Sequence, residues 1–246
     1  MLSFLIGYQV KKNEKITKES IEAYIEEHWQ EPEYGYSQKP AKYIALSFDD
    51  GPCGSSSYGG TEELLKTLEE LKIKASFFMI GSNIRYNKAS AQAVFAAGHE
   101  IGNHSFDHNR LGSSSVEEII EDLKAASALI KEITGKEPVL FRAPYLDHGA
   151  NLNEACGSLG MALIDGISHN DWPGSAEAIK NSVLANPKDG EIILLHENST
   201  SKGNTMSVLP DIAAGLREKG FWIMTVSELA AVKGKTLKPG TRYGSL

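Results

Sequence analysis

The chain has 246 residues and a formal net charge of −7 at pH 7, because 32 Asp and Glu residues outnumber 25 Lys and Arg residues. A domain of this length buries roughly 70–75% of the surface that its unfolded chain exposes, so it can fold without cross-links. The negative charge argues against a nucleic-acid partner, and the sequence has no apolar run long enough to predict a membrane span. The composition is that of an ordinary soluble globular protein, and no feature of it indicates an obligate protein partner.

The N-terminal part of the chain is predicted to hold a helix and a linker. The first ten residues are apolar, but the lysines follow the apolar part, which reverses the order of a secretory signal. We therefore expect a cytoplasmic protein, or a secreted or cell-surface protein from which a signal has been removed. Residues 16–29 carry apolar side chains at helical spacing, and residues 31–40, with two prolines and a glycine, are typical of a linker. The prediction is a helix-and-linker appendage over residues 1–40 and a main domain over residues 41–246.

From residue 42 onward, short apolar runs alternate with amphipathic helical segments. The predicted strands cover residues 43–48, 75–80, 99–102, 138–142, 161–165, 191–196 and 221–226, and the predicted helices cover residues 61–71, 89–97, 115–134, 153–159, 176–184 and 206–219. The longest helix is the best marked, because Ser115 and Glu118 form a capping box and Gly135 provides a C-terminal stop. The alternation predicts a parallel sheet covered by helices. About seven strand–helix units favour a β/α barrel, complete or incomplete, over an open doubly wound sheet.

Reactive side chains follow several of these strands, and the C-terminal ends of barrel strands are where catalytic groups collect. Asp49 and Asp50 follow the first strand and point in different directions, so one can bind a cation while the other accepts a proton. Taken alone, this pair would be a solvated turn. His104 and His108 are four residues apart, a spacing that puts two imidazoles on one face of a helical turn. One Asp and two His make a site with positions open for water and substrate, with zinc as the default ion and cobalt, manganese or nickel as alternatives.

Further candidates follow the later strands. Arg142 is either a partner that holds Asp49 ionised or a structural salt-bridge residue. Asp171 would orient His196 and raise the pKa of its imidazole, which makes an acid useful near neutral pH. The wall of a small apolar pocket is predicted from two apolar residues beside these groups, Trp172 and Leu195, although as lone residues they would be assigned to the core.

The two cysteines, Cys53 and Cys156, are too few for a disulfide framework. The sequence leaves open whether they pair with each other. Cys53 lies close to the Asp pair, but we interpret it as a small space-filling residue rather than a metal ligand.

Five short motifs at strand ends occur in an order that resembles one known family. They are SFDDG at 47–51, HSFDH at 104–108, RAPY at 142–145, DW at 171–172 and LLH at 194–196. Over residues 42–230 the chain resembles the NodB-like polysaccharide deacetylases of carbohydrate esterase family 4. Ser47 stands where threonine is commonest in that family, which is a conservative difference. The resemblance implies a distorted, incomplete β/α barrel of parallel strands, and it identifies residues 41–246 as the catalytic domain.

The resemblance also implies one divalent metal ion and a role for each motif residue. The residues that correspond to the metal ligands are Asp50, His104 and His108. The general base and the residue that holds it correspond to Asp49 and Arg142, and the general acid and its partner correspond to His196 and Asp171. The oxyanion donor corresponds to the main-chain N–H of Tyr145, and the acetyl-methyl pocket corresponds to Trp172 and Leu195. The implied reaction is hydrolysis of an acetyl group, with release of acetate.

The implied substrate is an acetylated polysaccharide or oligosaccharide, either O-acetylated xylan or the N-acetylated sugars of chitin or peptidoglycan. The RAPYL run at 142–146 and the tail at 233–246 resemble the xylan-type members. Two alternatives are a catalytically silent carbohydrate-binding barrel and another metal-dependent amidase or phosphatase. A silent barrel would lack a base, an acid or a ligand, and none is missing here. A phosphatase would favour two metal ions, whereas these residues provide ligands for one.

Overall fold

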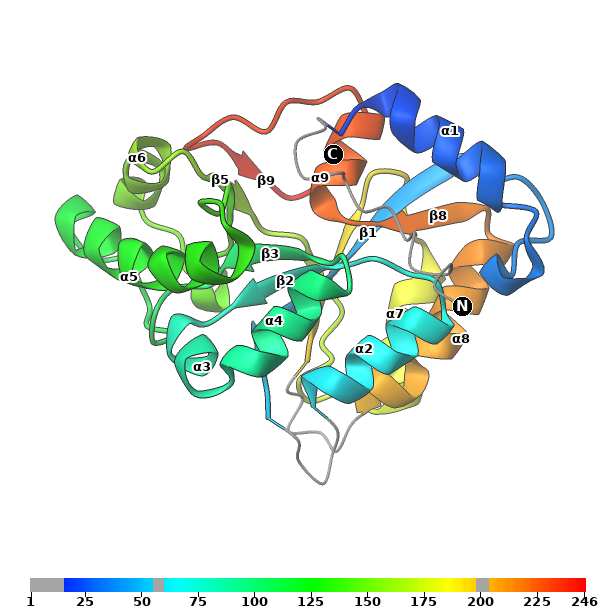
Figure 1. The fold of residues 1–246 in the computed structure, drawn as a ribbon, viewed down its shortest axis with the longest axis horizontal. Helices are drawn as coiled ribbons and strands as arrows, with labels where there is room; N and C mark the ends of the chain where they lie inside the picture. The colour runs from blue at the N-terminus through cyan, green and yellow to red at the C-terminus, as the bar shows by residue number, and fades with distance from the viewer. Residues whose placement is uncertain (1–15, 55–59, 198–203) are drawn as a thin grey trace.

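The computed structural model describes residues 16–54, 60–197 and 204–246, which form a curved sheet with helices around it (Figure 1). The strands are β1 (Lys42–Gly51), β2 (Ser76–Met79), β3 (Glu100–Asn103), β4 (Leu140–Phe141), β5 (Ala162–Ile164), β6 (Ile167–Ser168), β7 (Ile192–His196), β8 (Phe221–Met224) and β9 (Arg242–Tyr243). Their order is β6-β7-β1-β2-β3-β4-β5-β9, and β8 pairs with the first half of β1. All of the pairings between these strands are parallel.

Helices connect the strands and cover the outside of the sheet (Figure 1). The α-helices are α1 (Lys18–His28), α2 (Thr61–Glu70), α3 (Gly81–Tyr86), α4 (Lys88–Ala96), α5 (Val116–Thr134), α6 (Ala150–Ser158), α7 (Ala176–Ala185), α8 (Asn204–Glu218) and α9 (Val226–Val232), and two 3-10 turns are η1 (Pro32–Tyr34) and η2 (Pro144–Leu146). Helix α5 has the predicted capping box and ends at Gly135, which takes a left-handed φ of 76°. Among the described helices, none combines the length and the apolar character needed to cross a membrane.

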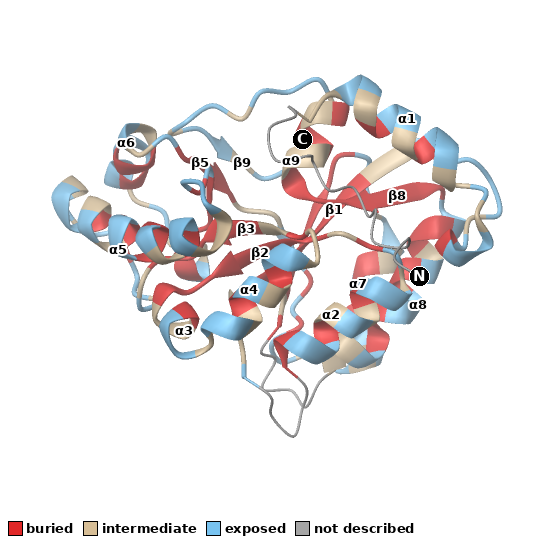
Figure 2. Cartoon of the chain, viewed as in Figure 1, coloured by how far each residue is buried: buried red, intermediate tan, exposed pale blue. Residues whose placement is uncertain are grey.

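Strand β1 lies in the middle of the sheet and its residues 44–49 are all buried (Figure 2). Successive side chains of a strand point to opposite faces. Ile44, Leu46 and Phe48 therefore pack together in one apolar cluster, which includes side chains of α2 and α8. Asp49 follows Phe48 and points to the other face, which is the interior of the curved sheet and the side on which the pocket described below opens. The alternation of side chains along β1 thus places the buried carboxylate of Asp49 in the interior of the curved sheet.

The sheet is an incomplete barrel, which confirms the predicted fold class. Strands β6 and β9 lie at the two ends of the strand order, and within the described residues no strand pairing joins them. The C-terminal tail reaches across part of this opening, because β9 pairs with β5 while Ser245 forms a bridge with Glu191 at the start of β7. The opening leaves the interior accessible at the C-terminal ends of the strands.

Several elements differ from the sequence prediction. Strands β6 and β9 are two residues long, too short to show a periodicity. The predicted strand 221–226 ends at Met224, because Thr225 and Glu228 form a capping box that starts helix α9. Both cysteines, whose pairing the sequence left open, are free thiols.

Helix α1 packs beside α9 and β8 at the end of the molecule away from the site (Figure 1). Ile21 and Ile25 of this helix are buried in the same apolar cluster as Trp222 of β8. The rings of Tyr34 and Tyr36 stack on Trp222 with centroid distances of 5.5 and 5.1 Å, and we call these three residues the aromatic cluster. The division near residue 40 into an appendage and a catalytic domain stays a prediction.

Candidate active site

A pocket of about 430 Å³ opens at the C-terminal ends of the strands. Its lining contains seven residues predicted from the sequence, namely Asp49, Asp50, His104, His108, Tyr145, Trp172 and His196, together with Ala143, Leu146, Ser168 and Leu194. Two further predicted residues, Arg142 and Asp171, are fully buried behind this lining. The structure therefore brings residues from five separate segments of the chain around one cavity.

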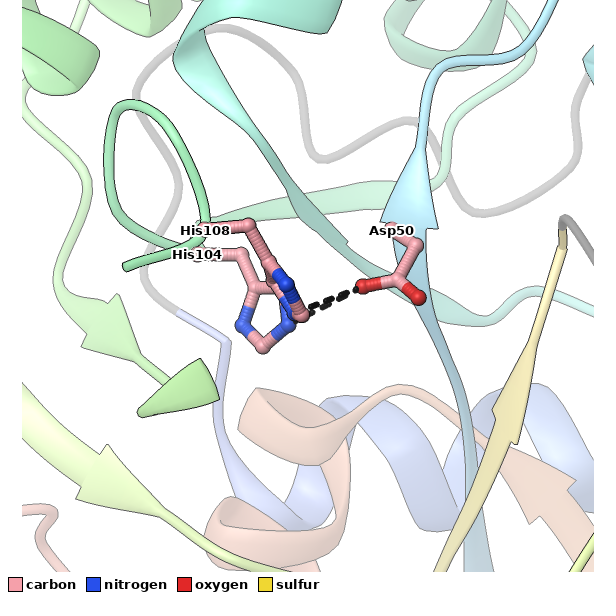
Figure 3. Close-up of side chains that lie close together, drawn as sticks. All are labelled: Asp50, His104 and His108. Carbon is pink, nitrogen blue, oxygen red and sulfur yellow. Dashed lines mark ion pairs between the residues drawn. The ribbon is translucent and has the colours of Figure 1, made fainter. Parts of the chain in front are cut away.

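Asp50, His104 and His108 form a cluster in which three potential ligand atoms converge (Figure 3). Oδ1 of Asp50 lies 3.3 Å from Nε2 of His104 and 3.1 Å from Nε2 of His108. This oxygen is buried, and no N–H or O–H group of the described residues donates a hydrogen bond to it. An ionised oxygen facing two ring nitrogens is a donor set that fits a divalent cation.

The tautomer of His104 also fits metal binding. Its Nδ1 lies 2.8 Å from the carbonyl oxygen of Arg142, and because a carbonyl can only accept, Nδ1 must carry the proton. In the neutral ring, Nε2 then presents a lone pair toward Asp50. A hydrogen bond on the far nitrogen is the usual way in which a protein orients a metal-binding histidine.

The two histidines are brought together by a loop and not by the helical turn predicted from their spacing. Residues 104–108 contain no helix, and Ser105 and His108 have left-handed φ values of 64° and 59°. The hydroxyl of Ser105 accepts a hydrogen bond from the main-chain N–H of His108 at 3.0 Å. The prediction that the rings lie together is confirmed, but its stated geometry is wrong, because a four-residue spacing does not reveal the backbone conformation.

Asp49 and Arg142 form a buried ion pair at the back of the pocket. Nη1 of Arg142 donates to Oδ1 of Asp49 at 2.6 Å, and Nε donates to the carbonyl of Ile164 at 2.9 Å. The guanidinium carbon also lies 4.0 Å from the centre of the Phe78 ring. Burial lowers the pKa of Arg142, and the charge and hydrogen bond of Asp49 oppose that effect. Since Oδ1 is occupied by Arg142, Oδ2 of Asp49 is the oxygen left to accept a proton.

His196 and Asp171 form a second pair on the opposite wall. Oδ1 of Asp171 lies 2.8 Å from Nδ1 of His196, while Oδ2 accepts hydrogen bonds from the main-chain N–H of His196 at 2.7 Å and the hydroxyl of Thr205 at 2.9 Å. Burial alone would lower the pKa of His196, but the hydrogen bond to Asp171 and the charges of Asp49, Asp171 and Asp50 raise it to about 9. The ring is therefore a protonated acid at neutral pH.

On the side of His196, the apolar lining of the pocket consists of Trp172 and Leu194, and the prediction of Leu195 is wrong. Leu195 is fully buried in the cluster between the sheet and its outer helices, whereas Leu194 lines the pocket. Side chains two positions apart share a face of a strand, so the residue that faces the same side as His196 is Leu194. Counting two residues back from His196 could have found it.

Other residues of the site were not predicted. Thr205 supports Asp171 from α8, and Ser168 lines the pocket from β6. Thr61 and Glu197 are joined by a hydrogen bond and lie next to residues 49–53, the segment that holds the Asp pair. These contacts connect positions far apart in the sequence, so no local pattern indicates them.

Comparisons with known proteins find a family model and several similar proteins. A family model described as polysaccharide deacetylase matches residues 36–164. The chain is similar to a bifunctional xylanase/deacetylase from Pseudobutyrivibrio xylanivorans, with 35% identity over 212 residues that cover 85% of this chain and 33% of that protein. It is also similar to a peptidoglycan-N-acetylglucosamine deacetylase from Bacillus cereus, with 35% identity over 201 residues that cover 78% of this chain and 90% of that protein.

One solved structure matches this chain over most of the length of both proteins. It is a family 4 acetyl xylan esterase from Clostridium thermocellum in complex with a cobalt ion, which matches with a TM-score of 0.77 and 30% identity and covers 83% of this chain and 99% of that chain. The chain studied here thus spans a third of the xylanase/deacetylase and nearly the whole of the esterase structure.

Proposed function

This chain belongs to the polysaccharide deacetylase family, and we propose from that premise that it is a metal-dependent hydrolase that releases acetate from an acetylated carbohydrate. Relatives in the family are named as deacetylases of xylan and of peptidoglycan. The observation that carries the proposal is the convergence of three features on one pocket. These are the Asp50–His104–His108 cluster, the Asp49–Arg142 pair and the His196–Asp171 pair.

The metal would be held by Asp50, His104 and His108. Two nitrogens and one carboxylate oxygen are a common ligand set of zinc, and cobalt, manganese or nickel accept the same donors. When bound, such an ion supplies Lewis-acid polarisation of the acetyl carbonyl and a lowered pKa of water.

Asp49 is the proposed general base. It would take the proton of the attacking water on Oδ2, because Arg142 engages Oδ1 and fixes the orientation of the carboxylate. The main-chain N–H of Tyr145, a residue of the pocket lining, is the proposed donor to the oxyanion that forms on attack.

His196 is the proposed general acid. Asp171 occupies Nδ1, so the proton that His196 can deliver to the leaving oxygen or nitrogen is the one on Nε2. Trp172 and Leu194 would contact the acetyl methyl group, because they are the apolar side chains of the lining on the side of His196.

An experiment that tests this function compares acetate release from acetylated xylan and from N-acetylated chitin oligomers, each with and without a chelator. We expect chelator-sensitive release, with the Asp49→Asn variant as an inactive control that still binds metal. Release from xylan would identify an O-acetyl esterase, and release from chitin oligomers an amide-cleaving deacetylase. We propose acetylated xylan as the first substrate, because the RAPYL run at 142–146 and the tail at 233–246 resemble the xylan-type members. Metal binding without release from xylan, chitin or peptidoglycan would instead support a carbohydrate-binding protein.

A further inference from the structure

Glu197 is a buried carboxylic acid next to the site but outside the pocket. It directly follows His196, is only 3% exposed, and is absent from the pocket lining described above. Its side chain packs against the segment Asp49–Cys53, which contains Asp49 and Asp50. None of the roles assigned to the deacetylase site uses it.

Hydrogen bonds join Glu197 to both ends of this segment. Its main-chain N–H donates to the carbonyl of Asp49 at 3.2 Å. Its Oε2 accepts from the hydroxyl of Thr61 at 2.5 Å, and that hydroxyl accepts in turn from the main-chain N–H of Cys53 at 2.8 Å. The segment is therefore attached at its first residue directly and at its last residue through Thr61.

The middle of the segment packs directly on the carboxyl group. A Cβ atom added to Gly51 would lie 1.4 Å from Oε1 of Glu197 and 2.1 Å from Cδ, so only glycine allows this approach. Among the described residues Oε1 has no hydrogen-bond partner. Burial and the charges of Asp50 and Asp49 together raise the pKa of Glu197 to about 7, against the lowering effect of the hydrogen bond from Thr61. A half-satisfied buried carboxyl group costs stability, so its presence here favours a role in shaping the site.

The segment also needs support because of its backbone conformation. Asp50 has a left-handed φ of 71°, which is unfavourable for a residue other than glycine unless its surroundings hold it. On the side opposite Glu197, the amide of Asn83 donates to the carbonyl of Asp50 at 2.7 Å, and Ile80 N–H donates to the carbonyl of Gly51 at 2.9 Å. Glu197 and Thr61 supply the support on the remaining side.

We propose that Glu197 is a positioning residue which, with Thr61, holds the main chain of Asp49–Cys53 so that the Asp50 carboxylate stays against His104 and His108. The inference rests on the proposed function, because it takes these three residues as the metal ligands. It adds to that function a residue that touches neither metal nor substrate.

The test is a titration of metal-free protein with Zn²⁺ by calorimetry, together with kcat/KM for acetate release and a thermal unfolding curve. We expect Glu197→Ala to raise the Kd for Zn²⁺ and lower kcat/KM by about 10- to 100-fold, the range found when support of a metal ligand is removed. Glu197→Gln keeps the shape and an acceptor for the Thr61 hydroxyl, so it should bind Zn²⁺ almost as the wild type does. A purely structural role would lower the unfolding temperature without changing the Kd.

Glu100 provides a matched control at the edge of the sheet where the N-terminal ends of the strands lie. Its carboxylate also accepts a hydrogen bond from a hydroxyl, that of Ser76 at 2.6 Å, but it lies at the start of β3. Glu100→Ala should lower the unfolding temperature and leave the Kd for Zn²⁺ unchanged.

Several results would overturn the inference. One is a Glu197→Ala protein that is folded and has the wild-type Kd, and another is a Glu197→Gln protein as impaired as Glu197→Ala. If Glu197→Ala does not fold, Thr61→Val removes only the hydroxyl link, and an unchanged Kd in that variant would count against the inference. If the Asp50→Ala variant binds Zn²⁺ with the Kd of the wild type, the proposed function is overturned, and this inference with it.

Discussion

The two ends of strand β1 are stabilised by different kinds of contact. At its C-terminal end, buried charges are arranged in pairs, with Asp49 bound to Arg142 and Asp171 bound to His196 on the facing wall. At its N-terminal end, Tyr43 pairs with Trp222, the centre of the aromatic cluster that holds α1. Burying charge is costly even when the charges are paired, whereas burying aromatic surface stabilises the fold. The first end therefore sets the geometry of the proposed active site, and the second supplies stability.

The comparison predicts that variants at the two ends separate turnover from stability. The largest effect on turnover is expected from Asp49→Asn. Loss of the general base should lower kcat by about 100- to 10,000-fold, while the ligands Asp50, His104 and His108 still bind metal. Stability should also fall, because the buried charge of Arg142 loses its counter-charge. Acetate release, metal content and urea unfolding measure the three quantities, and full activity would contradict the assignment of the base.

The next largest effect is expected from His108→Ala. Removing a ligand should weaken Zn²⁺ affinity by at least about 100-fold, since loss of mere ligand support costs about 10- to 100-fold. Metal analysis after dialysis checks the prediction, and an unchanged metal content would show that the cluster is not the metal site.

A smaller effect is expected from pH. The folded protein raises the pKa of His196 from 6.5 to about 9, so its acid form is present below that pH and is lost above it. Turnover should fall about tenfold per pH unit above the midpoint. The stability that the raised pKa provides should be fully present below about pH 6.5 and should be lost as the pH rises from there to about 9. A bound cation offsets nearby negative charge and moves the midpoint lower. In Asp171→Asn the midpoint should move toward 6.5, and an NMR titration of His196 would show whether it does.

The smallest effect on turnover, and a large one on stability, is expected from Trp222→Ala. Trp222 is 6% exposed and carries the stacked rings of Tyr34 and Tyr36, so truncation should cost about 3–5 kcal/mol of unfolding free energy. At temperatures where the variant is folded, kcat should equal that of the wild type. A large loss of kcat in the folded variant would mean that the two ends of β1 are not independent.

The sequence was sufficient for the strands that carry the site, and the reason is physical. Asp50 and His196 each follow an apolar run long enough to be read as a buried strand, and parallel strands bring their C-terminal ends to one edge. Leu195 was misassigned because the run 192–195 is apolar throughout, so it gives no sign of which residue faces which side. The loop at 104–108 depends on left-handed φ values that its residue types do not announce. Thr61 and Glu197 are 136 positions apart, and only the folded chain shows that they touch.

The guanidinium of Arg142 also spans the open barrel from one side to the other. It donates to Asp49 on β1 and to the carbonyl of Ile164 at the end of β5, and the strand order places β2, β3 and β4 between these two strands. A closed barrel fixes its own curvature through an uninterrupted ring of strand pairs, and within the described residues this sheet lacks that closure between β6 and β9. Arg142 therefore links β1 to β5 across the interior of the curved sheet and helps to set how wide the cavity opens. The width of the cavity and the position of the Asp49 carboxylate are consequently tied to one side chain, and neither can be altered there without altering the other.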